Sequence, residues 1–248
     1  MASSPPPKKR SWLRWLIGGI VVVLVLVVGG PFVYIHFIEG PAPAPLSLST
    51  ATTPPTTAKS GTPVSGTTAA TDKSGSLDGV WKVGSGSTAG YRVKEDLFGQ
   101  HAEAVGRTSS VTGSMTIAGT QVTKGSFTVD MTSVTSDRSQ RDGQFQGRIM
   151  DTATYPTSSF VLTTPIQLAP VPKDGVIKTY PATGKLTLHG TTKTVTIPLN
   201  TKRSGNVIQV QAILTITFSG YNIDNPSGGP ASVGNSGQME FLLQLQQS

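Results

Sequence analysis

The sequence predicts an all-β domain that follows a membrane anchor and a linker. Three observations support this prediction. Between residues 77 and 248, apolar and polar residues alternate with a period of two in many short segments, as half-buried antiparallel strands require. Turn-forming residues separate these segments at regular spacing, which is typical of a β-sandwich or a barrel. A run without Asp, Glu, Lys or Arg, from Leu16 to Ile38, is long enough to cross a bilayer as a helix.

The apolar run is preceded by positive charge. Lys8–Arg10 and Arg14 lie in residues 1–15, so this basic head is expected in the cytoplasm, with residues 16–38 as a transmembrane helix and the remainder outside. A cleaved signal peptide is the alternative, but its apolar region usually spans about 7–15 residues. The predicted location is therefore the cell membrane, single-pass, with an extracytoplasmic C-terminal domain.

Residues 39–76 form a linker that is rich in Pro, Ser, Thr, Ala and Gly. With almost no large apolar side chain it cannot bury a core, so a disordered stalk is expected. As a flexible coil, its mean end-to-end distance would be roughly 30–40 Å.

The domain at residues 77–248 is organised around a predicted β-hairpin at Gly184–Leu199. His189 and Gly190 provide its turn, and Pro198 removes a ladder donor, so the second arm should end there or lie at an edge. A polar segment at Asp137–Asp151 departs from alternation and predicts one short helix. The expected strands lie around residues 80–83, 91–93, 113–117, 126–131, 159–162, 184–188, 194–199, 207–218 and 239–245.

Several kinds of function find no support in the composition. The chain has no cysteine, which excludes disulfides, thiolate metal sites and a cysteine nucleophile. The formal net charge is +7, but the basic residues of the domain are scattered and form no run with interleaved aromatics, which disfavours a nucleic-acid partner.

Candidate catalytic motifs are equally weak. Gly84–Gly90 matches no phosphate-binding motif and is typical of a bulge or a bend. His101 and His189 are too few for a metal site, and His189 is expected to hold backbone carbonyls. Arg141 and Asp142 are neighbours that cannot face each other on a helix, so each should bond elsewhere. The sequence therefore predicts neither an enzyme nor a cofactor or metal.

The inward faces of the strands are rich in Phe, Met and Leu. A barrel of about eight strands has just enough interior either to be filled by such side chains or to hold one small ligand. The residue pattern does not choose between these two cases.

Seven segments stand in a characteristic order along the domain: Trp81–Val83, Ser87–Val93, Gly113–Met115, Phe127–Met131, Ser136–Asp142, Tyr155–Phe160 and Gly184–Gly190. With these landmarks, the domain resembles the YceI-like family of polyisoprenoid-binding, lipocalin-like proteins. Two positions depart from the pattern of many members: Gly84–Ser87 replaces an Asp followed by His-Ser, and Ile149–Asp151 replaces Phe-Phe-Asp.

The resemblance implies an antiparallel lipocalin-like barrel of about eight strands with one short helix, closed around an apolar cavity. It also implies a carrier without a catalytic centre, and it leaves a homodimer open. The residues expected to line the cavity are Phe127, Val129, Met131, Phe145, Phe160, Leu162, Leu186, Leu188, Val195, Ile197, Phe218, Phe241 and Leu243.

Two functions follow as hypotheses. The first is a membrane-tethered extracytoplasmic protein that carries or binds a membrane lipid, an isoprenoid or a similar amphiphile. The second is a structural or stress-related envelope module whose filled barrel acts through protein contacts.

Overall fold

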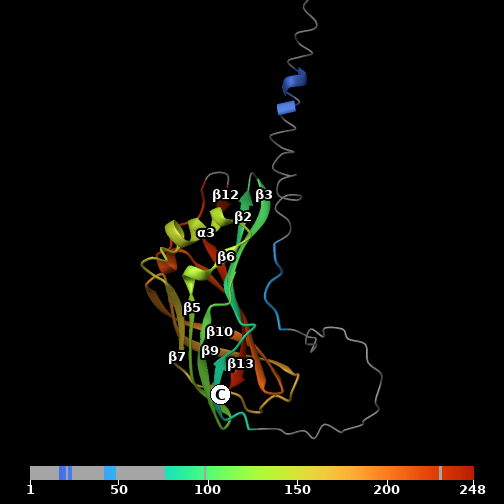
Figure 1. Cartoon of the computed structure of the whole chain (residues 1–248), viewed down its shortest axis with the longest axis vertical. Coiled ribbons are helices and arrows are strands. Elements are labelled where there is room, and N and C mark those ends of the chain that lie inside the picture. The colour runs from blue at the N-terminus through green and yellow to red at the C-terminus, as the bar shows by residue number, and fades with distance from the viewer. Residues whose placement is uncertain (1–16, 21, 24–41, 49–75, 98, 229–230) are drawn as a thin grey trace, which may run out of the picture.

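The computed structural model describes residues 17–20, 22–23, 42–48, 76–97, 99–228 and 231–248 (Figure 1). Within the predicted transmembrane run, residues 17–20 and 22–23 are helical and exposed. In the part of the chain that the structure describes, no helix is both long and apolar enough to span a bilayer. Most of the predicted anchor and of the linker lies outside the described residues.

The domain is an antiparallel β-barrel, which confirms the predicted fold class. β1 closes the barrel because it pairs with β4 on one side and with β13 on the other. The closed ring consists of β1 (Gly79–Val83), β4 (Val111–Ala118), β5 (Gln121–Asp130), β7 (Thr157–Leu162), β9 (Ile177–Leu188), β10 (Thr191–Ser204), β11 (Val207–Thr217) and β13 (Ser236–Gln247).

Further strands lengthen the barrel at one end. β2 continues β1 along β13, and β3 continues β4 along β2, so each pair acts as one bent strand. The bend between β1 and β2 is the glycine-rich segment, as predicted: Ser87 Oγ donates to the Gly84 carbonyl (2.8 Å) and accepts from the Gln244 N–H (2.9 Å). These strands are β2 (Thr88–Leu97), β3 (Gln100–Thr108), β6 (Thr135–Ser136) and β12 (Ala231–Val233), with β8 (Ile166–Gln167) beside β5.

β3 was not predicted, because the residues on its inward side are small. Ala104 lines the interior, and Gly106 lies against the ring of Tyr91. The large side chains of β3, such as Arg107, point to the outer face. Without bulky apolar residues at alternate positions, the strand lacks the signal on which the prediction depended.

The hairpin of β9 and β10 has the predicted turn. His189 and Gly190 both have positive φ values (48° and 69°), as a two-residue hairpin turn of the primed type requires. The Nδ1 atom of His189 lies 3.2 Å from the carbonyl oxygen of Tyr221, so this histidine does hold a backbone carbonyl.

Of the two alternatives for Pro198, an end of the strand or an edge position, the second is confirmed. β10 does not end there but continues to Ser204. Its register with β11 begins only at Asn200, so Pro198 lies in the part of β10 that pairs with β9 alone. The missing N–H donor is tolerated at such an edge position.

The predicted short helix is present as α3 (Ser139–Gln144), which continues into a π-helical turn, η4 (Phe145–Ile149). Asp142 accepts hydrogen bonds from the N–H (2.7 Å) and the hydroxyl (2.6 Å) of Ser136, while Arg141 pairs with Asp137 and Glu95. The two neighbours therefore bond elsewhere, as predicted. Two 3-10 turns, η3 (Met131–Ser133) and η5 (Ser219–Tyr221), lie at the same end of the barrel (Figure 1).

Two apolar clusters line the barrel interior, one towards each end. The first surrounds Trp81 and Leu245, near the C-terminus, and the second surrounds Phe145, Leu188 and Phe218, near α3. Between and beside these clusters lies the cavity described next.

Candidate ligand cavity

An apolar cavity of about 830 Å³ occupies the interior of the barrel. This volume lies in the range of about 300–1,000 Å³ that is common for small-molecule sites. Its wall draws on both clusters, from Ile117 and Leu168 at one end to Phe145 and Phe218 at the other. The structure therefore resolves the question that the residue pattern left open, because the barrel is not completely filled.

The structure places every predicted lining residue except Val195 on the cavity wall. Val195 packs half-buried against the cluster near α3 instead. The residues on the wall are Phe127, Val129, Met131, Phe145, Phe160, Leu162, Leu186, Leu188, Ile197, Phe218, Phe241 and Leu243.

Cross-strand pairs build one side of this wall. Phe127 lies opposite Phe160, and Phe160 lies opposite Leu186, so three strands contribute one continuous apolar row. Gly184, next to this row, leaves room for the Phe160 ring. A Cβ atom at Gly184 would lie 2.4 Å from Phe160 Cζ, so only glycine fits beneath the ring.

Tyr91 forms the wall beside the helix. Its ring stacks on Phe145 with centroids 4.9 Å apart and planes inclined by 13°. Burial raises the pKa of Tyr91 to about 12; the Arg141 guanidinium opposes this shift, and the carboxylates of Asp142, Glu95 and Asp137 add to it. The phenol is therefore neutral at physiological pH and presents no charge to the cavity.

The cavity wall becomes polar at the α3 end. Glu95, Arg138, Arg141 and Gln144 line it there. The Nη2 atom of Arg141 lies 3.6 Å from Glu95 Oε1, and both side chains retain some exposure (16% and 12%). A molecule in the cavity would thus meet mostly apolar walls along the barrel and charged groups near α3. Lys202 and Arg203 of β10 also line the cavity, beside the β10–β11 turn.

Part of this wall was not among the predicted lining residues. Ile208 and Val210 lie on it and are in phase with Phe218 in the predicted strand, so alternation offered a signal for them. Arg138 and Arg141 offered none, because charged residues on a short helix usually face solvent.

The histidines of the domain bond locally. His101 Nδ1 lies 2.5 Å from an oxygen of Asp96 on the exposed surface, and His189 holds the Tyr221 carbonyl. Among the residues that the structure describes, no group of three or more His, Asp or Glu side chains is placed to hold a metal ion.

A closed antiparallel barrel around an apolar cavity defines a lipocalin-like ligand-binding fold. The chain belongs to the YceI-like domain family, whose family model matches residues 81–245. No curated protein matches the chain significantly.

The solved structures that are similar to it include two with TM-scores above 0.5. One is described as a polyisoprenoid binding domain from Saccharophagus degradans implicated in plant cell wall breakdown, with a TM-score of 0.56 and 20% identity over 68% of this chain and 98% of that one. The other is BcnA of Burkholderia cenocepacia, with a TM-score of 0.51 and 22% identity over 64% of this chain and 95% of that one. At these identities, the similarity establishes a shared fold.

Proposed function

We propose that this protein is a membrane-tethered, extracytoplasmic binding protein that holds an isoprenoid or a similar amphiphile in its barrel. The cavity is the observation that carries the proposal, since its volume, apolar wall and charged end match such a molecule. The family and the description of the Saccharophagus degradans domain support an isoprenoid as the ligand.

The physical basis of binding is burial of the chain. Each CH₂ group transferred from water to the cavity contributes about 0.8 kcal/mol, so a long chain needs no charged contact to bind. Length and shape of the cavity would then select the ligand, while Glu95 and Arg141 at the α3 end suit a polar head. The alternative, a structural module, requires a filled barrel, and a cavity of about 830 Å³ favours the carrier.

The membrane tether is the second part of the proposal. It is supported by the uncharged run at residues 16–38 and by the basic residues before it. The same asymmetry of charge supports an extracytoplasmic barrel.

Filling the cavity tests the proposal. Val129 lies on the wall, so Val129→Trp should occupy the space of the ligand. We expect lipid to be extracted from the purified wild-type chain and most of it to be lost from this variant. Val161→Trp is the matched control, because Val161 is 45% exposed on the neighbouring strand and does not line the cavity.

Stability provides the second readout. A side chain added to empty space should change the free energy of unfolding little, whereas overpacking a filled core costs about 1–3 kcal/mol. Absence of lipid from the wild type, together with such a loss of stability in Val129→Trp, would contradict the proposed function.

A further inference from the structure

The outer surface of the barrel carries a cluster of buried polar residues. Arg92 on β2, Gln211 on β11 and Glu240 on β13 are only 4%, 7% and 2% exposed. Their sequence neighbours Tyr91 and Phe241 line the cavity, so alternation directs Arg92 and Glu240 outward. Charged side chains at outward positions normally meet water, and burying them is costly unless partners replace it.

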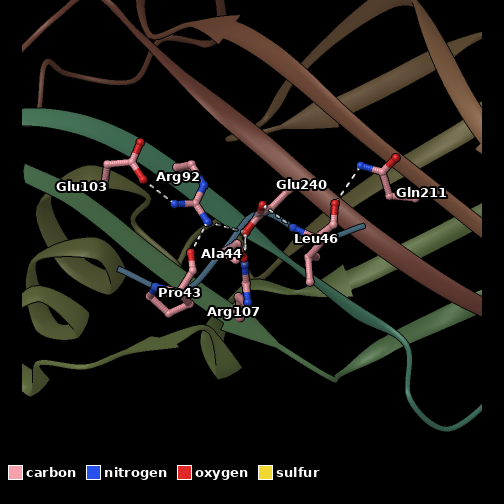
Figure 2. A network of polar contacts seen from close by, with 8 residues as sticks. All are labelled: Pro43, Ala44, Leu46, Arg92, Glu103, Arg107, Gln211 and Glu240. Carbon is pink, nitrogen blue, oxygen red and sulfur yellow. Dashed lines mark hydrogen bonds and ion pairs between the residues drawn. The ribbon is translucent and has the colours of Figure 1, made fainter. Parts of the chain in front are cut away.

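Within the cluster, the charged side chains are partners for one another. Arg92 Nη1 donates to Glu103 Oε2 (2.5 Å), while Nε and Nη2 of Arg107 donate to Glu240 Oε1 (3.0 and 2.7 Å). Arg92 Nη2 also lies 3.7 Å from Glu240 Oε1. Two guanidinium groups thus face two carboxylates, and the charges balance (Figure 2).

A segment of the linker, residues 42–48, covers the cluster, and we call it the strap. Its carbonyl oxygens accept hydrogen bonds from the cluster: Arg92 Nη2 donates to Pro43 (2.5 Å) and Arg107 Nη2 to Ala44 (2.5 Å). Gln211 Nε2 donates to the Leu46 carbonyl (2.9 Å), and the Leu46 N–H donates to Glu240 Oε2 (3.1 Å). The expectation of a stalk without structure is therefore wrong for residues 42–48.

The strap sequence fits a surface that is rich in donors. The carbonyl oxygens of Pro43 and Ala44 are the acceptors for the two arginines. Pro43 and Pro45 have no N–H, so neither proline leaves a donor unpaired. The Leu46 N–H is placed against a carboxylate. Proline also restricts the free segment, which lowers the conformational entropy lost on docking. The cluster therefore recognises the main-chain groups of the strap. Figure 2 shows the strap passing across the strands that bear the cluster.

A glycine beneath the strap makes the cluster possible. Gly90 lies opposite Arg107 in the β2–β3 register and opposite Glu240 in the β2–β13 register. A Cβ atom at Gly90 would lie 2.9 Å from Arg107 Cγ and 2.1 Å from the Gly106 carbonyl oxygen. The absence of a side chain therefore lets Arg107 cross β2 to reach Glu240.

We propose that this outer polar cluster is a docking site for the strap of the same chain. The docked strap runs in one direction along the barrel. Pro43 contacts Arg92, and β2 continues from there towards Leu97 beside β12, at the α3 end. Leu46 contacts Gln211, nearer the opposite end of the barrel. The N-terminal end of the strap thus points towards the α3 end of the cavity.

Docking would also shorten the tether. From Ile38 to Ala42 the chain can span at most roughly 14 Å, compared with roughly 30–40 Å for a flexible stalk. If residues 16–38 are an anchor, as the proposed function states, the docked strap holds the charged α3 end of the cavity towards the bilayer. This orientation rests on the proposed function, whereas docking itself does not.

Because the chain has no cysteine, pairs of spin labels can test docking directly. Ser47→Cys on the strap and Thr215→Cys on β11 both replace exposed residues. In the full chain in phosphatidylcholine nanodiscs, we expect one narrow distance between the labels. Leu46→Pro removes the donor to Glu240 and should broaden the distribution, while Ser65→Pro in the linker should leave it narrow. A broad distribution without Leu46→Pro would overturn the proposal.

Single labels test the orientation. Ser139→Cys lies on α3, and Lys173→Cys lies beside the β10–β11 turn at the opposite end. With nickel-chelating lipids in the nanodisc, the label at residue 139 should relax several-fold faster than the label at residue 173, and Leu46→Pro should reduce this ratio. Equal rates with a narrow strap distance would overturn the orientation alone. A chain with a narrow strap distance that retains no lipid would contradict the proposed function but not docking.

Discussion

Neighbouring residues on β2 and β13 face opposite sides of the barrel wall, and both sides exclude water. Tyr91 and Phe241 face the cavity, whereas Arg92 and Glu240, one position away, face the strap. The inner environment is apolar and leaves space for a ligand. The outer environment is charged, and a segment of the chain itself covers it.

The two surfaces select what they bind in different ways. Burial of apolar area is non-directional, so the inner wall constrains the shape and length of an occupant. Charge-assisted hydrogen bonds are directional and costly to leave unmade, so the outer cluster requires a carbonyl or an N–H at a defined position. We therefore expect the outer surface to be more sensitive to substitution, although it lies on the far side of the barrel wall from the ligand.

The largest effect is expected from Glu240→Gln. This change removes the negative charge that two guanidinium groups share. It also leaves one acceptor oxygen where two are used, Oε1 by Arg107 and Oε2 by the Leu46 N–H. Breaking a buried ion pair costs about 3–5 kcal/mol. We expect the lower end of this range in the free energy of unfolding, because Arg107 retains 26% exposure.

Chemical denaturation of the full chain measures this loss. Asp96→Asn is the matched control, since its carboxylate is 54% exposed and such pairs contribute less than about 1 kcal/mol. Equal losses in the two variants would mean that the outer cluster is solvated and that the comparison of the two surfaces is wrong.

Much of the fold could be predicted because it depends on local pattern. Alternation located the hairpin and most strands of the barrel, and the departure from alternation at Asp137–Asp151 located α3. β3 was not predicted, because small residues, Ala104 and Gly106, occupy its inward positions. The large side chain that fills the space there is Tyr91 of the partner strand β2. The fit of a small residue to a large one across strands is a tertiary property that one segment does not reveal.

The inner and the outer surface also differed in how far they could be predicted from the sequence. Residues of the inner wall such as Phe127 and Phe160 were predictable, because large apolar side chains at alternate positions indicate an interior. Arg92 and Glu240 looked like ordinary outward residues, since their burial depends on a strap distant in sequence. The composition of the strap correctly indicated that it cannot form its own core, but composition does not show that another surface can order it.

A moderate effect is expected on the inner side from Gly106→Ala. A Cβ atom there would lie 2.3 Å from Tyr91 Cε1, so the ring must leave its stack on Phe145. We expect a loss of about 1–3 kcal/mol in the free energy of unfolding, as for other overpacked sites. Gly143→Ala in α3 is the control, because a Cβ atom at Gly143 would meet nothing within 4 Å beyond the helix's own backbone, and alanine favours the helix. A neutral Gly106→Ala would show that the Tyr91 ring is not fixed.

The smallest effect on stability is expected from Phe241→Leu, again on the inner side. Phe241 lies between Ala89 and Ala212 in the register, and its ring faces the cavity. A ring that borders empty space has fewer packing contacts to lose than one in a filled core. The change should therefore alter the free energy of unfolding by less than about 1.5 kcal/mol.

The same substitution should enlarge the cavity, and this gives it a functional readout. If the proposed function holds, Phe241→Leu should shift the preferred ligand towards longer chains in a competition among isoprenoid alcohols of increasing length. Leu242→Met, at the adjacent outward position, should leave that preference unchanged. A loss of about 3 kcal/mol or more in Phe241→Leu would instead resemble the truncation of a phenylalanine in a close-packed core. In that case the inner wall would be as sensitive to substitution as the outer cluster, and the shape of the cavity alone could not determine what the barrel holds.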